Sequence, residues 1–302
     1  MKHKFSRILC AALYCAPLVV AAQNNEKAAP LQQYYQKGKT LFQEKAYSAA
    51  IAPLRAFLQK AETEGSQPSH TGEVLEAEYM LACSAYEMRD GRSNEFLQNF
   101  LDNHPDTPHA NRIYALMASN YFFAQDYDNA LALFNASDLS LLADNERDDM
   151  TYRRAMCYLE TGKVKEAAIW FETLKNTSPR YETDCTYYLS YIRYTQQRYD
   201  EALNGFLTLQ DNYQALVPYY IAEIYLVKKQ YDKAEIVAQN YLSAYPGNEN
   251  TAEMYRIIGS ACYHMGKYHE AMQAFEQNDA ATRRDARYMY GLASYHCGVY
   301  SQ

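Results

Sequence analysis

The residues of this chain that could perform acid–base or metal chemistry are few and poorly placed for it. His264 and His269 are five residues apart and straddle a turn, so they do not share one helix face, and His104 and His109 flank two prolines. The sequence contains no GxGxxG, no P-loop, no HExxH and no CxxC pattern. We therefore predict that the chain is not an enzyme, and that it holds neither a cofactor nor a metal ion.

Tyrosine offers a different chemistry, that of recognition. The chain contains 31 tyrosines and one tryptophan. A tyrosine ring is flat and largely apolar, and its hydroxyl forms hydrogen bonds, which makes the residue a frequent anchor at protein interfaces. Tyr187, Tyr191 and Tyr194 follow one another at the spacing that places residues on one face of a helix. This spacing predicts a tyrosine stripe.

The helices that must position these tyrosines are indicated by a recurring phrase, Tyr-x-x-Ala-hydrophobic-x-x-aromatic in its commonest form. Copies begin at residues 47, 127, 164, 199, 231 and 268, and from residue 127 onward they are 32 to 37 residues apart. A helix with an aromatic, a small and a second aromatic residue precedes the phrase, as in Tyr114, Ala118 and Tyr121. A fixed period of this length predicts a solenoid of stacked helix pairs.

The phrase and the turn residues predict where the units begin and end. Seven units are expected at 31–60, 74–105, 109–138, 147–179, 182–210, 215–246 and 252–279, and an eighth begins near Arg284. Alanines in the second helices, at Ala130, Ala202 and Ala271, are expected to let two helices cross closely. The sequence ends before the second helix of the eighth unit, so we expect a truncated array.

The N-terminal 22 residues resemble a signal peptide, with a basic start, an apolar run and small residues before Gln23. Residues 23–30 are expected to form a flexible leader. An uncleaved anchor fits less well because the run is short and contains Pro17. A lipid anchor fits less well because Cys10 and Cys15 lie too early in the run. We predict an exported, periplasmic protein with no membrane span after cleavage.

Charge and cysteine content restrict the partners and the chemistry further. The formal charge is −7, and cleavage would make it about −10, which disfavours nucleic acid as a partner. Five cysteines remain after cleavage, an odd number without close spacing. Cys83, Cys157 and Cys262 lie in predicted first helices, where we expect them to act as small buried hydrophobes rather than as redox or metal-binding groups.

The repeated pattern resembles the tetratricopeptide repeat over about 270 residues. The Leu-Gly pair of the ideal first helix is present only in relaxed forms such as Ile258-Gly259. The chain is also similar to the N-terminal part of long secreted tetratricopeptide proteins of Gram-negative bacteria. The resemblance implies an all-α fold, a right-handed solenoid of antiparallel helix pairs, with a groove lined mainly by first helices.

The family geometry also implies which residues point into that groove. The candidates are mostly tyrosines of the C-terminal half: Tyr152, Tyr187, Tyr191, Tyr194, Tyr219, Arg256, Tyr263, Tyr288 and Tyr295. Two interpretations of these rings stay open. They could pack between neighbouring units, or they could line a groove for an extended peptide or helix of a partner.

The leading functional hypothesis is a non-enzymatic periplasmic scaffold that binds a protein or peptide through the groove. The alternative is that the array is the targeting half of a longer envelope enzyme or of a transport or secretion component, whose active part would lie beyond residue 302. A third hypothesis is that the tyrosines bind a glycan. The sequence names no partner.

Overall fold

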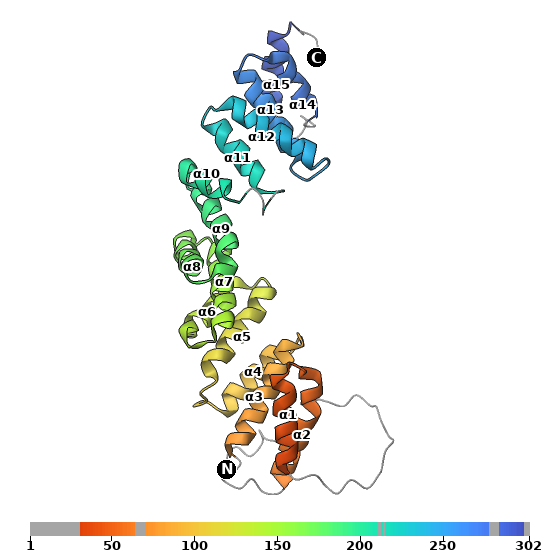
Figure 1. Cartoon of the computed structure of the whole chain (residues 1–302), viewed down its shortest axis with the longest axis vertical. Coiled ribbons are helices and arrows are strands. Elements are labelled where there is room, and N and C mark those ends of the chain that lie inside the picture. The colour runs from red at the N-terminus through yellow and green to blue at the C-terminus, as the bar shows by residue number, and fades with distance from the viewer. Residues whose placement is uncertain (1–30, 64–70, 210–212, 214, 278–283, 299–302) are drawn as a thin grey trace, which may run out of the picture. The chain divides into compact units, whose positions relative to one another are not determined.

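The computed structural model describes residues 31–63, 71–209, 213, 215–277 and 284–298, and folds them into α-helices (Figure 1). No β-strand occurs in this described part. The predicted signal peptide and leader lie outside it. The chain divides into two compact units, Met1–Phe96 and Leu97–Gln302, and the division falls inside helix α4 (Ser93–Asn103).

The first unit is built on three mutually packed helices, α1 (Leu31–Gln43), α2 (Tyr47–Thr63) and α3 (Thr71–Glu87). Tyr35 of α1 is buried against Phe57 of α2, with ring centroids 5.2 Å apart. Gly38 allows these helices to approach closely, because a Cβ atom there would lie 2.6 Å from the side chain of Leu54. Gln32 donates a 2.8 Å hydrogen bond to Glu73 and so links α1 to α3.

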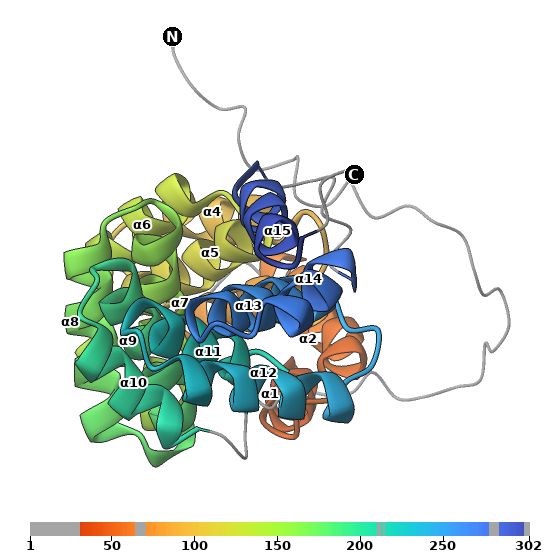
Figure 2. The same ribbon diagram turned by 90° about the horizontal axis from the view of Figure 1, so that it is seen from above.

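The second unit continues as pairs of helices, each packed on its neighbours in the chain (Figure 1). These helices are α5 (Ala110–Phe123), α6 (Tyr127–Ala136), α7 (Asp144–Glu160), α8 (Val164–Thr177), α9 (Glu182–Thr195), α10 (Tyr199–Leu207), α11 (Val217–Val227), α12 (Tyr231–Ala244), α13 (Thr251–His264), α14 (Tyr268–Gln277) and α15 (Arg284–His296). Short 3-10 helices, η2 (Leu139–Leu141) and η3 (Pro179–Tyr181), precede α7 and α9. In Figure 2, α6, α8 and α10 lie outside α5, α7 and α9.

The turn inside each pair has one recurring conformation. The residue two positions before the phrase adopts a left-handed backbone with φ between +59° and +78°: Lys45, Gln125, Gly162, Gln197, Lys229 and Gly266. The next backbone N–H then donates back to the last turn of the first helix, as Asp126 does to Tyr121 and Arg198 does to Arg193, each at 2.9 Å. This arrangement satisfies carbonyl groups that a helix end leaves unpaired, and it starts the second helix at a fixed residue.

The core forms where helices cross. Ala130, Ala202 and Ala271 are completely buried, which confirms the close crossings expected at these alanines. At the Gly259 crossing, an added Cβ atom would lie 2.7 Å from the ring of Phe275. Larger residues on either side fill the space, and the apolar clusters extend from each pair into the next. Each pair therefore depends on its neighbours for burial.

The cysteines of the described helices belong to this core. Cys83, Cys157 and Cys262 are buried free thiols, which confirms their predicted burial in first helices, and Cys185 of α9 is buried as well. Burial raises the pKa of Cys157, Cys185 and Cys262 to about 12, so these thiols stay protonated near neutral pH. In the described part, no group of three His, Cys, Asp or Glu residues is arranged to hold a metal ion. None of the described helices combines the length and apolarity that crossing a membrane requires.

Candidate protein-binding surface

The candidate groove residues all lie on first helices of the second unit. Their distribution is as follows: Tyr152 on α7; Tyr187, Tyr191 and Tyr194 on α9; Tyr219 on α11; Arg256 and Tyr263 on α13; Tyr288 and Tyr295 on α15. The structure brings the tyrosines of α7, α9 and α11 into one continuous set of ring contacts. Arg256 does not join these ring contacts and instead forms ion pairs with two glutamates. The two tyrosines of α15 are largely exposed to solvent.

The first layer of ring contacts surrounds Tyr152. Its ring stacks on Tyr181, with centroids 4.9 Å apart and an interplanar angle of 22°. It also meets the edge of Tyr188 at 6.1 Å. Tyr188 in turn stacks on Phe171 of α8 at 5.1 Å. Tyr152 therefore helps to pack α7 against α8 and α9, and part of its ring is covered by this packing.

A second layer repeats this arrangement one pair later. Tyr187 stacks on Tyr213 at 4.7 Å, and Phe206 of α10 stacks on Tyr220 of α11 at 5.0 Å. Tyr187 and Tyr188 meet edge to face at 5.2 Å, which joins the two layers. In these two layers the second-helix phenylalanine, Phe171 or Phe206, lies against a tyrosine of the next first helix.

An aspartate fixes each layer by a hydrogen bond. Tyr181 donates to Asp149 at 2.7 Å, and Tyr213 donates to Asp184. The two acids begin matching tetrapeptides, Asp-Met-Thr-Tyr ending at Tyr152 and Asp-Cys-Thr-Tyr ending at Tyr187. This repeated Asp-x-Thr-Tyr motif was visible in the sequence, and it would have indicated the paired aspartates. The tyrosines that complete the bonds lie in connections between pairs, where the repeat phrase gives no signal.

The remaining tyrosines of this region surround Tyr220. Tyr191 meets its ring at 5.9 Å, Tyr194 at 5.3 Å and Tyr219 at 5.2 Å, all close to edge to face. Tyr194 also contacts Tyr199 at the start of α10. Tyr152, Tyr187, Tyr191, Tyr194 and Tyr219 are all half-buried. Packing covers part of each ring, as the first interpretation of the sequence expects, and leaves another part accessible.

Arg256 has a structural role that its place in the repeat did not reveal. Its guanidinium pairs with Glu223 of α11 and, at 2.7 Å, with Glu253 of its own helix. The side chains of Arg256 and Glu223 are only 12% and 11% exposed. An arginine that is already paired on two sides and nearly covered has little capacity left for a partner.

The tyrosines of the last helices differ from those of the central layers. Tyr263 of α13 is half-buried and contacts Tyr268 at 5.5 Å and His296 at 6.0 Å. Tyr288 and Tyr295 of α15 are 67% and 64% exposed. These two rings present most of their surface to solvent on α15, which is the last helix that the structure describes.

Burial of the central tyrosines predicts instability in alkali. Burial raises the pKa of Tyr194 to about 12, and burial together with the hydrogen bond to Asp149 raises the pKa of Tyr181 to about 12. An unfolded tyrosine ionises near pH 10. The stabilisation from keeping these phenols neutral is therefore complete below pH 10 and is lost as the pH rises from 10 to 12.

We expect tyrosinate absorbance to rise in two stages. Exposed tyrosines should ionise first, and the central ones should ionise only together with loss of the far-ultraviolet circular dichroism of helix. Reversible ionisation of all 31 tyrosines near pH 10 with unchanged helix content would contradict this prediction.

Comparison with known proteins explains the periodic architecture. Two family models described as tetratricopeptide repeat match the chain, one over residues 76–107 and the other over residues 116–181. The chain contains tetratricopeptide repeats. Within residues 116–181, α7 is a first helix, and the phrase found in the sequence forms second helices α6 and α8. No curated protein sequence matched the chain.

Solved structures give the fold. The C-terminal part of a tetratricopeptide repeat protein from Cytophaga hutchinsonii is similar with a TM-score of 0.54 at 14% identity, over 84% of this chain and 98% of that one. This likeness confirms the predicted fold class, an all-α, right-handed solenoid of antiparallel helix pairs. A tetratricopeptide repeat protein from Parabacteroides merdae has a TM-score of 0.46 at 14% identity, over 87% and 98% of the two chains. MamA of AMB-1 has a TM-score of 0.48 at 17% identity, over 57% and 98%.

Proposed function

We propose that this protein is a non-enzymatic periplasmic scaffold that binds another protein through the first-helix tyrosines of its tetratricopeptide repeats. The observation that carries the proposal is the continuous set of half-buried tyrosine rings on α7, α9 and α11. Rings that are fixed by their neighbours lose little conformational freedom when a partner covers their accessible parts. Repeats of this type present extended surfaces on which partner proteins bind.

One feature supports the periplasmic location. The first 22 residues have the basic start, apolar run and small-residue end of a signal peptide. We place the protein in the periplasm rather than on a lipid anchor because no cysteine follows the apolar run directly.

The exposed tyrosines of α15 allow binding to be tested separately from folding. Replacing Tyr288 and Tyr295 with serine should weaken partner binding while leaving the thermal midpoint within about 2 °C of the wild type, since surface substitutions change stability little. Leu141→Ser is the matched control, because Leu141 is 73% exposed and lies in η2, outside the candidate surface.

The decisive experiment is photocrosslinking of the full-length gene product in the periplasm. A photoreactive residue at Tyr191 or Tyr219 should give a discrete adduct that decreases in the double serine variant. The same residue at Asn240, which is exposed on second helix α12, should give none. Adducts from Asn240 alone, or adducts from Tyr191 that the α15 substitutions do not affect, would contradict binding through this surface.

A further inference from the structure

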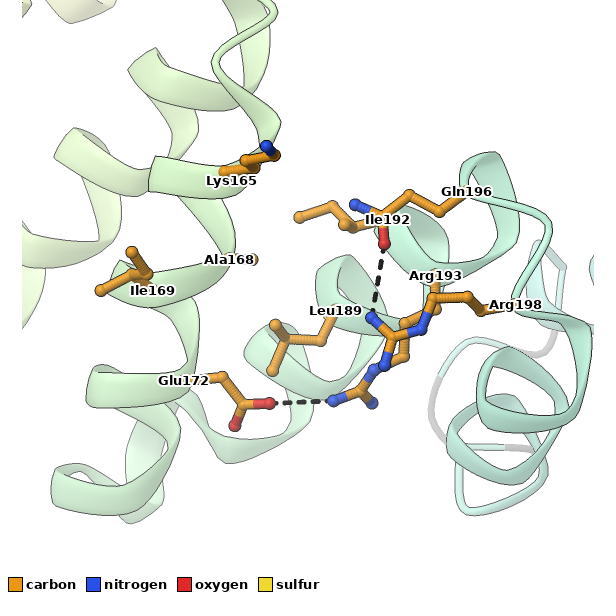
Figure 3. A pocket seen from close by; sticks show the side chains of 9 residues that line it. All are labelled: Lys165, Ala168, Ile169, Glu172, Leu189, Ile192, Arg193, Gln196 and Arg198. Atoms are coloured by element: carbon orange, nitrogen blue, oxygen red, sulfur yellow. Dashed lines mark hydrogen bonds and ion pairs between the residues drawn. The ribbon is translucent and has the colours of Figure 1, made fainter.

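A cavity of about 480 Å³ lies between second helix α8 and the C-terminal half of α9 (Figure 3). None of the candidate tyrosines lines it. Its floor is aliphatic and consists of Ala168 from α8 with Leu189 and Ile192 from α9. Ile169 stands at its edge and is 64% exposed, so apolar surface at this place is in contact with water. Covering such surface is favourable for an aliphatic group of a partner.

The rim of this cavity is cationic. Arg193 donates to Glu172 at 2.8 Å, and Arg198 donates to Glu201 at 2.8 Å and to Gln196 at 3.4 Å. Figure 3 shows the Arg193–Glu172 and Arg198–Gln196 contacts side by side. Both guanidinium groups therefore have an acidic partner within the protein.

Lys165 is the cation that remains. It lies on the α8 side of the cavity, and within the described ranges no carboxylate reaches its ammonium group at ion-pair distance. This rim therefore has three cations, Lys165, Arg193 and Arg198. Only two carboxylates, those of Glu172 and Glu201, pair with them. The positive surplus favours an incoming carboxylate over an incoming ammonium group.

A second hollow has a different lining. It measures about 830 Å³ and is lined by residues of α12, α13 and α14. Its lining includes Glu235, Glu270 and Glu276 and contains no lysine or arginine, although Lys267 pairs with Glu235 at 2.7 Å. A surplus of cations is therefore not shared by both hollows of the second unit.

We propose that the α8–α9 cavity docks an acidic, aliphatic peptide segment of a partner protein. A leucine-like side chain enters against Ala168, Leu189 and Ile192, and a neighbouring aspartate or glutamate of the partner pairs with Lys165. The site is formed by residues of second helix α8 and first helix α9 and by Arg198 before α10, and none of its lining residues is one of the candidate tyrosines. It therefore provides a second docking point whose existence does not depend on the proposed function.

The test uses the full chain with labelled isoleucine methyl groups, observed by NMR. The probe is the N-acetylated, C-amidated pentapeptide Asp-Leu-Asp-Leu-Asp, and its neutral control replaces each aspartate with asparagine. We expect saturable shifts at Ile169 and Ile192 but none at Ile236, which is exposed on α12 and lies outside both cavities. The neutral peptide should bind about fivefold more weakly, which is the range expected for one solvent-accessible ion pair.

A matched pair of variants locates the charge. Lys165→Gln should weaken the acidic peptide about fivefold, and Lys163→Gln, an exposed lysine outside the cavity, should leave its affinity unchanged. Three outcomes would overturn the proposal. The neutral peptide could bind as tightly as the acidic one, the two lysine variants could have equal effects, or millimolar peptide could produce no saturable shift. Shifts produced by sodium octanoate and not by the peptide would also overturn it, since they would indicate a lipid site.

Discussion

Replacing Phe206 with alanine is expected to reduce the free energy of unfolding by about 3–5 kcal/mol, the usual cost of deleting a buried phenylalanine ring. Phe206 is completely buried and stacks on Tyr220 with an interplanar angle of 5°. It also meets the edge of Tyr187 at 6.2 Å. One ring thus connects α10 with both α9 and α11, and alanine would leave a cavity where three helices meet.

Phe123→Ala is the matched control for this prediction. Phe123 lies at the end of α5 and is 61% exposed, so removal of its ring should change stability by less than about 1 kcal/mol. The measurement is urea unfolding followed by circular dichroism, with the midpoint compared at equal slope. If Phe206→Ala unfolds at the same urea concentration as Phe123→Ala, the aromatic stacks do not hold neighbouring pairs together.

The starts of the second helices were predictable because their determinants are local. Helices α6, α8, α10, α12 and α14 begin at the first residue of the phrase in each copy. The left-handed turn two residues earlier and the hydrogen bond across it involve only adjacent parts of the chain. Spacing in the sequence therefore translates directly into a helix start.

First-helix starts were less accurate. Helix α7 begins at Asp144, three residues before the unit expected there, and α3 begins at Thr71 rather than at residue 74. Helix α2 also continues through Pro53, although proline removes one hydrogen bond from a helix interior. Pro53 is buried, so contacts with other helices offset the local preference.

The roles of individual tyrosines could not be assigned from periodicity. Tyr152 and Tyr187 were expected at groove positions, and their stacking partners Tyr181 and Tyr213 lie about thirty residues away in connections between pairs. The spacing of residues in the sequence shows which side chains share one face of a helix. It does not show which ring from a distant part of the chain covers that face. Tyr288 was also expected at a groove position, and it is 67% exposed, whereas Tyr152 and Tyr187 are half-buried.

The ion-pair partner of Arg256 could not be predicted from periodicity either. Its position in the repeat suggested a groove residue, and its partner Glu223 lies one pair earlier, on α11. We expect Arg256→Met to reduce the free energy of unfolding by about 3–5 kcal/mol, because breaking a buried ion pair leaves the remaining charge without a partner. Arg180→Met is the control, since Arg180 is 65% exposed and its pair with Asp149 should contribute less than about 1 kcal/mol.

A second substitution separates loss of charge pairing from loss of packing. In Arg256→Met combined with Glu223→Leu, no charge is left buried on α11, and apolar side chains of similar size replace the pair. Such replacements are often neutral or stabilising, so the double variant should recover most of the stability lost by Arg256→Met. Urea unfolding of the wild type, Arg256→Met, Glu223→Leu and the double variant gives the coupling energy between the two residues. A double variant as unstable as the single one would mean that Arg256 stabilises the α11–α13 contact through packing of its aliphatic stem, and that its charge contributes little.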